Sequence, residues 1–244
     1  MKVLITGSSG QIGTNLGLYL LRAGHQVVGL DKRASTWTDA FPTVIHDLIE
    51  EGIPLPMEAD MVIHLAAWAK VHRLVVNPTL AFENVRMTDT MLEFCRITKT
   101  PIVLGSSREV YGHPVMLPVA EDARYDTLSP YAASKASCEM MVRAYTECYG
   151  IRHLIFRFSN VYGRYDNDLE RMERVTPLFI KQIGEGEPIS VFSDKKLLDF
   201  TYVDDCVDGI CRGMLALHAK TVENETINLS GGDPRKLTDL AEII

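Results

Sequence analysis

The chain has 244 residues, of which 46% are hydrophobic, and a formal net charge of −7. A chain of this length can bury one sizeable core, or a main domain and a smaller lobe, and its acidic balance argues against a surface that binds nucleic acid. No apolar run reaches the ~20 residues of a membrane-spanning helix, and the first strand starts too near Met1 for a cleavable signal. The five cysteines form no CxxC pair and the histidines are scattered, so we expect reduced thiols, a cytoplasmic location and no metal site.

The first 31 residues are typical of a dinucleotide-binding unit. Residues 3–6 predict a buried strand, and Gly7, Gly10 and Gly13 follow it at three-residue spacing. A helix and a second strand come next, and that strand ends on Asp31. Glycines let the backbone approach a pyrophosphate at the helix N-terminus, and the later carboxylate can accept hydrogen bonds from ribose hydroxyls. A glycine turn that only packs a helix on a sheet is the less favoured alternative, because it does not account for the acid.

Strands and helices alternate through the first 160 residues, which predicts an α/β fold with a doubly wound parallel sheet of the Rossmann type. Further strands are expected at 44–46, 61–66, 101–104 and 154–158, and helices at 78–98 and 130–149. After Asn160 the alternation breaks, with short strands expected at 189–192 and 199–203. We therefore expect a dinucleotide-binding domain over residues 1–160 and a smaller substrate-binding lobe over 161–244, partly interleaved with the main sheet. Residues 237–244 have helical spacing without a helix-ending signal, so we expect a truncated or unusually short chain.

Tyr131 and Lys135 lie four residues apart on a predicted helix, so both side chains are on one face. A free tyrosine hydroxyl has a pKa of about 10, and a cation within ~6 Å favours the phenolate that can act as a base. Ser107 follows the fifth strand and is expected in the same crevice, because ligands bind beyond the carboxyl ends of such strands. Its hydroxyl could hydrogen-bond the oxygen that gains or loses the proton. The alternative for the tyrosine and lysine is an ordinary solvated helix face.

Several motifs in register resemble the extended short-chain dehydrogenase/reductase family, within it the NAD-dependent sugar-nucleotide epimerase/dehydratase branch. The matching segments are TGSSGQIG at 6–13, HLAA at 64–67, NV at 84–85, SSREVYG at 106–112, YAASK at 131–135, RFSNVYG at 157–163 and DFTYVDD at 199–205. The resemblance implies NAD as the cofactor and a nucleotide-diphosphate sugar as the substrate. It also implies epimerisation at C4 of that sugar through a transient 4-keto intermediate.

The resemblance also implies a role for each matching residue. The catalytic set is Ser107, Tyr131, Lys135 and Glu109. The cofactor-binding set is Gly7, Ser9, Gly10, Gln11, Ile12, Gly13, Asp31, Lys32, Arg33, Asp47, Leu48, Leu65, Ala66, Ala67, Asn84, Ser106, Tyr131, Lys135, Phe158 and Ser159. The substrate-binding set is Trp68, Ser107, Arg108 and Asn160, although a tryptophan that packs a loop is the favoured alternative for Trp68. NAD is expected over NADP because Asp31 would repel a 2′-phosphate, although Lys32 and Arg33 are a counter-signal.

Two positions depart from the family pattern. Arg108 stands where 4,6-dehydratases carry an acid, and a guanidinium cannot donate that proton, which favours epimerisation over dehydration. Arg108 could instead bind the carboxylate of a uronic-acid sugar, while Glu109 keeps decarboxylation open as an alternative, and an ordinary surface pair is another. Leu198 stands where the family has an arginine that grips the diphosphate, a role that Lys195 or Lys196 could take. A non-catalytic NAD-binding scaffold or sensor is a further alternative.

The resemblance also implies a homodimer in which the helices near 80–98 and 130–149 pair with their copies. Small or pliable side chains on the second helix would allow close approach, namely Ala132, Ala133, Ala136, Met140 and Ala144. The alternative is that these side chains only pack on the sheet within one chain.

Overall fold

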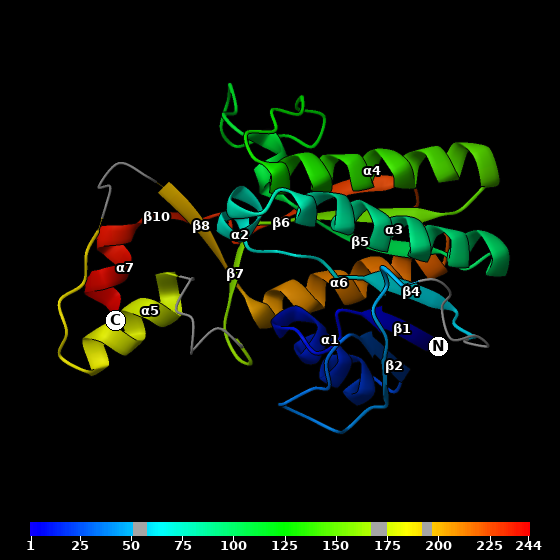
Figure 1. Ribbon diagram of the computed structural model, residues 1–244, viewed down its shortest axis with the longest axis horizontal. Helices are drawn as coiled ribbons and strands as arrows, with labels where there is room; N and C mark the ends of the chain where they lie inside the picture. The colour runs from blue at the N-terminus through cyan, green and yellow to red at the C-terminus, as the bar shows by residue number, and fades with distance from the viewer. Residues whose placement is uncertain (51–57, 167–174, 192–196) are drawn as a thin grey trace.

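The computed structural model describes residues 1–50, 58–166, 175–191 and 197–244, and a seven-stranded parallel sheet forms its centre (Figure 1). The strand order is β3-β2-β1-β4-β5-β6-β9. The strands are β1 (Lys2–Thr6), β2 (Gln26–Asp31), β3 (Thr43–Ile45), β4 (Met61–His64), β5 (Ile102–Ser107), β6 (His153–Phe158) and β9 (Glu225–Leu229). All residues of β4, β5 and β6 are buried, as expected for strands covered on both faces. The predicted Rossmann-type fold is confirmed.

Helices cover the sheet on both faces. α1 (Gln11–Arg22) and α6 (Val203–His218) pack together on one face, and α3 (Thr79–Thr98) and α4 (Pro130–Tyr149) pack together on the other. The short α2 (Val71–Val76) precedes α3. α4 begins as the sequence predicts, because Ser129 Oγ accepts a hydrogen bond from Ala132 N at 3.1 Å. No helix in the described part of the chain combines the length and apolar character that crossing a membrane requires.

A second, three-stranded sheet lies beside the main one, at the left of Figure 1. Its order is β10-β8-β7, from β7 (Asn160–Tyr162), β8 (Leu197–Tyr202) and β10 (Pro234–Lys236). α5 (Val175–Gly184) and α7 (Leu237–Ile243) lie next to it. Although β9 and α6 come after Asn160, they belong to the main sheet and its cover, so the last third of the chain contributes to both sheets. The strand predicted at 189–192 is wrong for 189–191, which have no regular structure, while residue 192 lies outside the described residues.

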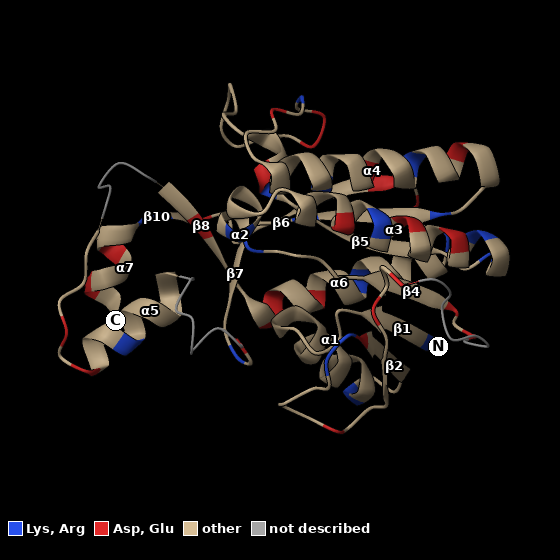
Figure 2. Ribbon diagram, in the orientation of Figure 1, with Lys and Arg blue, Asp and Glu red and all other residues tan. Residues whose placement is uncertain are grey.

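Charged side chains of both signs are mixed over α3 and α4 (Figure 2). Loops at the carboxyl ends of the parallel strands carry most of the residues singled out by the sequence. They include the turn between β1 and α1, and the short helix η1 (Arg108–Tyr111) directly after β5. The candidate site is therefore at this edge of the main sheet.

Candidate active site

The turn between β1 and α1 is shaped by glycines that leave no room for side chains. Gly7 has a φ of +72°, and a Cβ added there would lie 2.7 Å from Ala66 N. A Cβ on Gly13 would collide with Gly7 O. α1 starts after Gly10, which as a glycine provides no side-chain cap for the first helical N–H groups. The result is a backbone cradle at a helix N-terminus, the arrangement that suits a pyrophosphate.

Asp31 ends β2 as a buried carboxylate beside this cradle. Its Oδ2 accepts from Ser9 N at 3.0 Å, and its Oδ1 accepts from Arg33 N at 3.0 Å. Ser9 Oγ in turn donates to Arg33 O at 2.8 Å. A carboxylate has about four acceptor positions, so these two bonds orient Asp31 and leave acceptor capacity for ribose hydroxyls.

Lys135 fixes the predicted catalytic face of α4 against the end of β5. Its buried Nζ donates to Gly105 O at 2.8 Å, and burial lowers the pKa of the ammonium. Tyr131, one helical turn earlier on the same face, is also buried. Ser107 is the last residue of β5, two residues after Gly105, and its Oγ accepts from Glu109 N at 3.2 Å. Lysine and serine therefore meet at one strand end.

Ser106, also predicted to bind the cofactor, turns its side chain into the protein. Neighbouring residues of a strand point to opposite faces of the sheet, so the Ser106 side chain turns away from that of Ser107. Its Oγ donates to Glu139 Oε1 at 2.5 Å, inside a buried cluster. The cofactor-binding role of Ser106 stays a prediction, in which the backbone of Ser106 would make the contact, since its hydroxyl bonds to Glu139.

Asn84, predicted as a cofactor contact, makes three hydrogen bonds within the protein. Its Oδ1 accepts from Trp68 N at 2.7 Å, and its Nδ2 donates to Trp68 O at 3.2 Å and to Ser134 Oγ at 3.0 Å. Ser134 Oγ continues the chain of bonds to Tyr131 O at 2.8 Å. With the side chain 2% exposed, Asn84 positions the loop after β4 relative to the first turn of α4.

Trp68 lies beside Lys32 and Glu83. The Lys32 ammonium is 3.8 Å from the centroid of the indole ring and 3.8 Å from Asp47 Oδ2. The indole Nε1 donates to Glu83 Oε2 at 2.6 Å, and the ring packs on the core beneath α3, where Leu48 is buried. These contacts connect Trp68 with the residues predicted near the adenine, and they favour the alternative that it packs a loop.

The remaining cofactor residues line or support the same edge. Gln11 Nε2 donates to Gly163 O at 2.9 Å, which ties α1 to the loop after β7. Leu65 and Phe158 flank Gly105, where an added Cβ would lie 2.9 Å from each side chain. Ile12 packs against the core shared by α1 and α6, whereas Ala66 and Ala67 follow β4 as partly buried residues.

The predicted substrate residues Arg108 and Asn160 are brought together. Arg108 Nη2 lies 3.3 Å from Asn160 Oδ1 and 3.1 Å from Glu109 Oε1. Asn160 Nδ2 donates to Asp199 O at 2.8 Å, and Ser159 Oγ donates to the same carbonyl at 2.6 Å. Arg108 of η1, Ser159 after β6 and Asn160 at the start of β7 thus converge with β8.

Asp199 has a linking role that sequence reasoning did not assign to it. Besides its carbonyl, its carboxylate accepts from Gly231 N at 2.8 Å and from Gly232 N at 2.7 Å. It thereby joins the segment after β6, strand β8 and the turn before β10. The signal was present in the DFTYVDD motif that contains it, but only the fold identifies its partners.

Leu198, which stands where the family has an arginine that grips the diphosphate, lies in the second sheet. Leu198 is buried in β8, and it pairs in antiparallel register with Arg235 of β10. Lys195 and Lys196, the predicted substitutes, lie outside the described residues. Residues that face each other in an antiparallel pair have side chains on the same face of the sheet. The side chain of Arg235 therefore lies on the same face as that of Leu198.

A parallel sheet with a glycine cradle after its first strand defines a Rossmann-type α/β protein. The model of the NAD dependent epimerase/dehydratase family matches residues 3–230, and the chain belongs to this family. A UDP-glucuronate 4-epimerase from Thermodesulfobacterium geofontis is 32% identical over 267 residues, which cover 99% of this chain and 79% of the relative.

Solved structures agree with this assignment. A UDP-glucose 4-epimerase with UDP-glucose from Thermotoga maritima is 25% identical, with a TM-score of 0.88 over 100% of this chain and 81% of that one. An NAD-dependent NDP-hexosamine 5,6-dehydratase involved in tunicamycin biosynthesis is 29% identical, with a TM-score of 0.85 over 99% of this chain and 79% of that one. The similar proteins therefore include epimerases as well as a dehydratase.

Proposed function

We propose that the protein is an NAD-dependent enzyme that inverts C4 of a nucleotide-diphosphate sugar. The observation that carries the proposal is the 2.8 Å bond from Lys135 Nζ to Gly105 O, because it joins the Tyr131/Lys135 face to the strand end that bears Ser107. A protein that only binds NAD would not require Ser107, Tyr131 and Lys135 together at one strand end. The alternative of a non-catalytic sensor is therefore less favoured.

NAD fits the residues present. The backbone cradle at Gly7 and Gly13 admits a pyrophosphate without side-chain obstruction, and Asp31 offers an oriented carboxylate to the adenosine ribose. When bound, NAD supplies an acceptor for a hydride that it later returns, so the overall reaction has no net redox change. Lys135 is suited to hold the nicotinamide ribose, and Leu65 and Phe158 form an apolar wall near the same strand end.

The protein residues handle the proton. Tyr131 takes the proton of the C4 hydroxyl, the ammonium of Lys135 favours the phenolate that does so, and Ser107 hydrogen-bonds the sugar oxygen. The 4-keto sugar then presents its other face, and Tyr131 returns the proton to give the 4-epimer. This assigns general-base and general-acid roles to a single phenol.

Arg108 favours epimerisation over dehydration. It occupies the position from which an acid would protonate a departing hydroxyl, and a guanidinium cannot do so. Its contacts to Asn160 and Glu109 both use Nη2, so the Nη1 donors are suited to a hydrogen bond with the carboxylate of a uronic-acid sugar. Glu109 forms an ion pair with Arg108, and decarboxylation stays the alternative that this carboxylate supports.

The lobe around the second sheet would bind the rest of the substrate. Asn160 lies against β8 through Asp199, which suits it to contact the nucleotide sugar. Arg235, across from Leu198, is suited to supply the cation for the diphosphate. Within residues 161–244, this gives the segments around the second sheet a substrate-binding role, while β9 and α6 complete the NAD-binding part.

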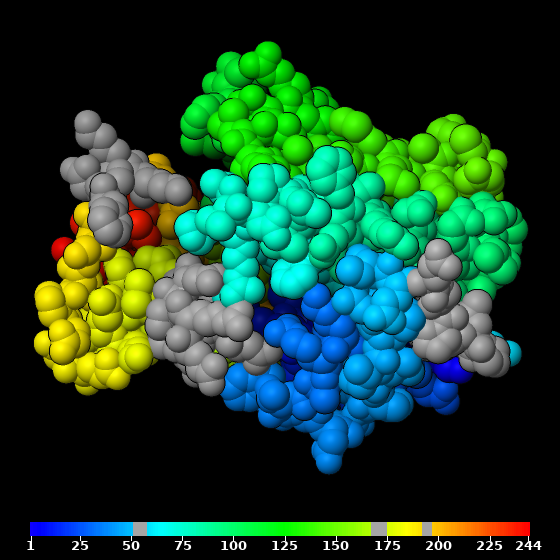
Figure 3. Space-filling view, in the orientation of Figure 1, coloured from blue at the N-terminus to red at the C-terminus, as the bar shows by residue number. Residues whose placement is uncertain are grey.

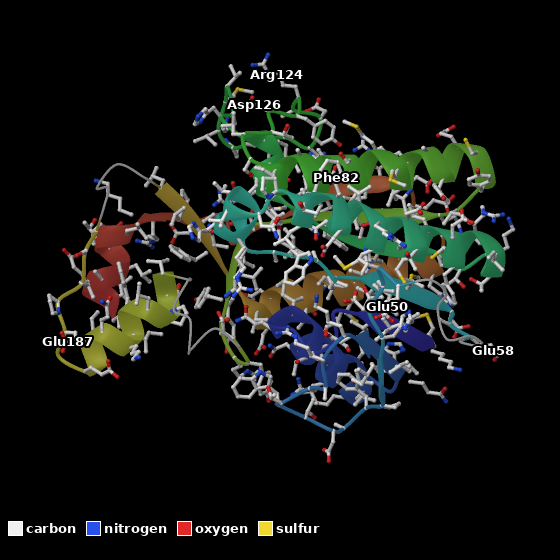
Figure 4. All side chains as sticks on the ribbon, viewed as in Figure 1. Glu50, Glu58, Phe82, Arg124, Asp126 and Glu187 are labelled. Atoms are coloured by element: carbon white, nitrogen blue, oxygen red, sulfur yellow. The ribbon has the colours of Figure 1, made fainter. Side chains whose placement is uncertain are left out.

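We also propose a homodimer through α3 and α4 and a cytoplasmic location. Phe82 of α3, labelled in Figure 4, is 76% exposed, and Met140 of α4 is 53% exposed, which suits a contact between copies. Ala132 and Ala136 are buried within the chain itself, which for these two supports the alternative that they pack within one chain. All five cysteines are free thiols, which supports a reducing compartment.

The deciding experiment incubates the purified protein with UDP-glucose and, separately, with UDP-glucuronate, and follows the products by NMR. We expect the 4-epimer in at least one case, with UDP-glucuronate preferred. A 4-keto-6-deoxy sugar would establish a dehydratase, and a pentose with released carbon dioxide would establish a decarboxylase. Either product would overturn the epimerase assignment.

A further inference from the structure

Lys32 and Trp68 make a contact between loops that belong to strands not adjacent in the sheet. Lys32 directly follows β2, and Trp68 comes shortly after β4. In the strand order β3-β2-β1-β4, β1 lies between them, so their strands are about 10 Å apart at ordinary strand spacing. The 3.8 Å contact of the ammonium with the indole ring therefore bridges the carboxyl end of β1, where the glycine cradle begins.

The two ends of this bridge differ in how firmly they are held. Trp68 is anchored on α3, because its backbone bonds to Asn84 and its indole N–H donates to Glu83. Among the described residues, Lys32 is held by the ring and by a 3.8 Å ion pair with Asp47, and its side chain is 38% exposed. A long, partly exposed lysine side chain can leave its partners easily, whereas the indole cannot move without breaking bonds to α3.

The bridge starts one residue after the carboxylate that is suited to hold the adenosine ribose. Any dinucleotide that contacts both Asp31 and the cradle at Gly7 must run along the edge that the bridge crosses. Figure 3 shows the surface of the segments that follow β2 and β3, in blue, against the cyan surface of the α2 and α3 region. A dinucleotide bound in this way would have its adenosine half next to Lys32 and Trp68.

Given the proposed NAD-dependent function, we propose that Lys32 and Trp68 form a strap that retains the adenosine half of the cofactor. Trp68 stays fixed on α3, and the Lys32 side chain moves when the strap opens. Both are positioning residues, since neither touches the reacting atoms. A reaction that removes a hydride and returns it to the same sugar needs the reduced cofactor to remain bound between the two steps. A strap that slows cofactor release meets this need.

The test uses the fluorescence of Trp68 as its readout. The chain has two tryptophans, so a Trp37→Phe background leaves Trp68 as the single emitter, and bound NADH should quench it by energy transfer. Protein loaded with NADH is mixed with excess NAD in a stopped-flow instrument, and the recovery of emission gives the NADH release rate. Lys32→Met removes the cation, and Lys181→Met, at an exposed position of α5, is the matched control.

We expect Lys32→Met to release NADH three- to tenfold faster, in line with the loss of one cation–π contact and one weak ion pair, and Lys181→Met to match the parent. Lys32→Gln, which retains a polar side chain without the charge, should also release NADH faster. Equal release rates in the parent and both Lys32 variants overturn the strap and leave NAD binding intact. A parent protein that binds no NADH overturns both the strap and the proposed cofactor.

Discussion

Arg157 and Glu139 form an ion pair that is fully enclosed in the protein, with Arg157 Nη2 at 2.7 Å from Glu139 Oε2 and side-chain exposures of 1% and 0%. The pair joins β6 to α4, and Glu139 also accepts from Ser106, the residue before Ser107. Tyr125 donates to the same carboxylate at 2.8 Å. A closed polar cluster thus supports the strand end that carries the candidate catalytic serine.

Removal of one partner of this pair should be costly. Arg157→Met leaves the Glu139 carboxylate buried without its cation, and we expect a loss of ~3–5 kcal/mol in the free energy of unfolding, measured by urea titration. Arg143→Met is the matched control, because Arg143 lies 4.0 Å from the same carboxylate but is 46% exposed, and it should cost less than ~1 kcal/mol. Similar losses of stability in the two variants would show that the buried ion pair contributes no more than the exposed one.

The catalytic role of Tyr131 is tested by removal of one oxygen. Tyr131→Phe should reduce turnover by ~100-fold or more, because the general base is lost, while NAD affinity in a calorimetric titration stays nearly unchanged. Tyr149→Phe, at the exposed end of the same helix, should turn over like the parent. Comparable turnover in the Tyr131 variant would remove this residue from the mechanism.

Cofactor preference depends on the charge of Asp31. The parent should bind NAD more tightly than NADP, since the carboxylate repels a 2′-phosphate. Asp31→Asn keeps the size of the side chain but removes its charge. We expect it to lower the ratio of NAD affinity to NADP affinity by ~10-fold, about 1.4 kcal/mol, when both cofactors are titrated by calorimetry. Tighter NADP binding by the parent would mean that Arg33 receives the phosphate.

The stability of the fold should fall in mild acid because of His64. This side chain is buried between Thr6 Oγ1 at 2.7 Å and Thr88 Oγ1 at 3.1 Å, and burial, with the nearby charge of Lys135, lowers its pKa to about 3. A histidine in the unfolded chain titrates near 6.5. The contribution of neutral His64 to the free energy of unfolding is therefore complete above that pH, and it is lost as the pH falls from about 6.5 toward 3.

The measurement compares urea unfolding of the parent and His64→Gln at pH 7 and pH 5. The parent should lose ~2 kcal/mol more than the variant over this interval, because only the parent's unfolded state gains the proton at position 64. His153 is present in both proteins, so its own titration cancels in the comparison. An identical pH dependence of the two proteins would show that His64 is not kept neutral by the fold.

The dimer prediction rests on exposed apolar side chains of α3 and α4. Phe82→Glu combined with Met140→Glu should convert a dimer into a monomer at micromolar concentration, measured by light scattering, because charges would be buried in the interface. Val115→Glu, on a loop and 90% exposed in the parent, should leave the mass unchanged. A monomeric parent would refute the interface directly.

Local patterns in the sequence were enough to predict several features. The glycine spacing after β1, Ser129 as the cap of α4 and the four-residue spacing of Tyr131 and Lys135 each depend on neighbours within a turn or two of chain. Alternating strands and helices then left few topologies, because parallel crossovers have one hand. The family and the sheet followed from these short-range signals.

Contacts between distant segments were decided only by the tertiary structure. The side chains of Ser106 and Ser107 turn to opposite faces because of the pleat of β5, and the partners of the Asn84 amide depend on where the loop after β4 meets α4. The Lys32–Trp68 bridge and the Arg157–Glu139 pair join elements whose proximity comes from the strand order. A side chain's partners are determined by packing across the sheet, and no spacing along the chain encodes that distance.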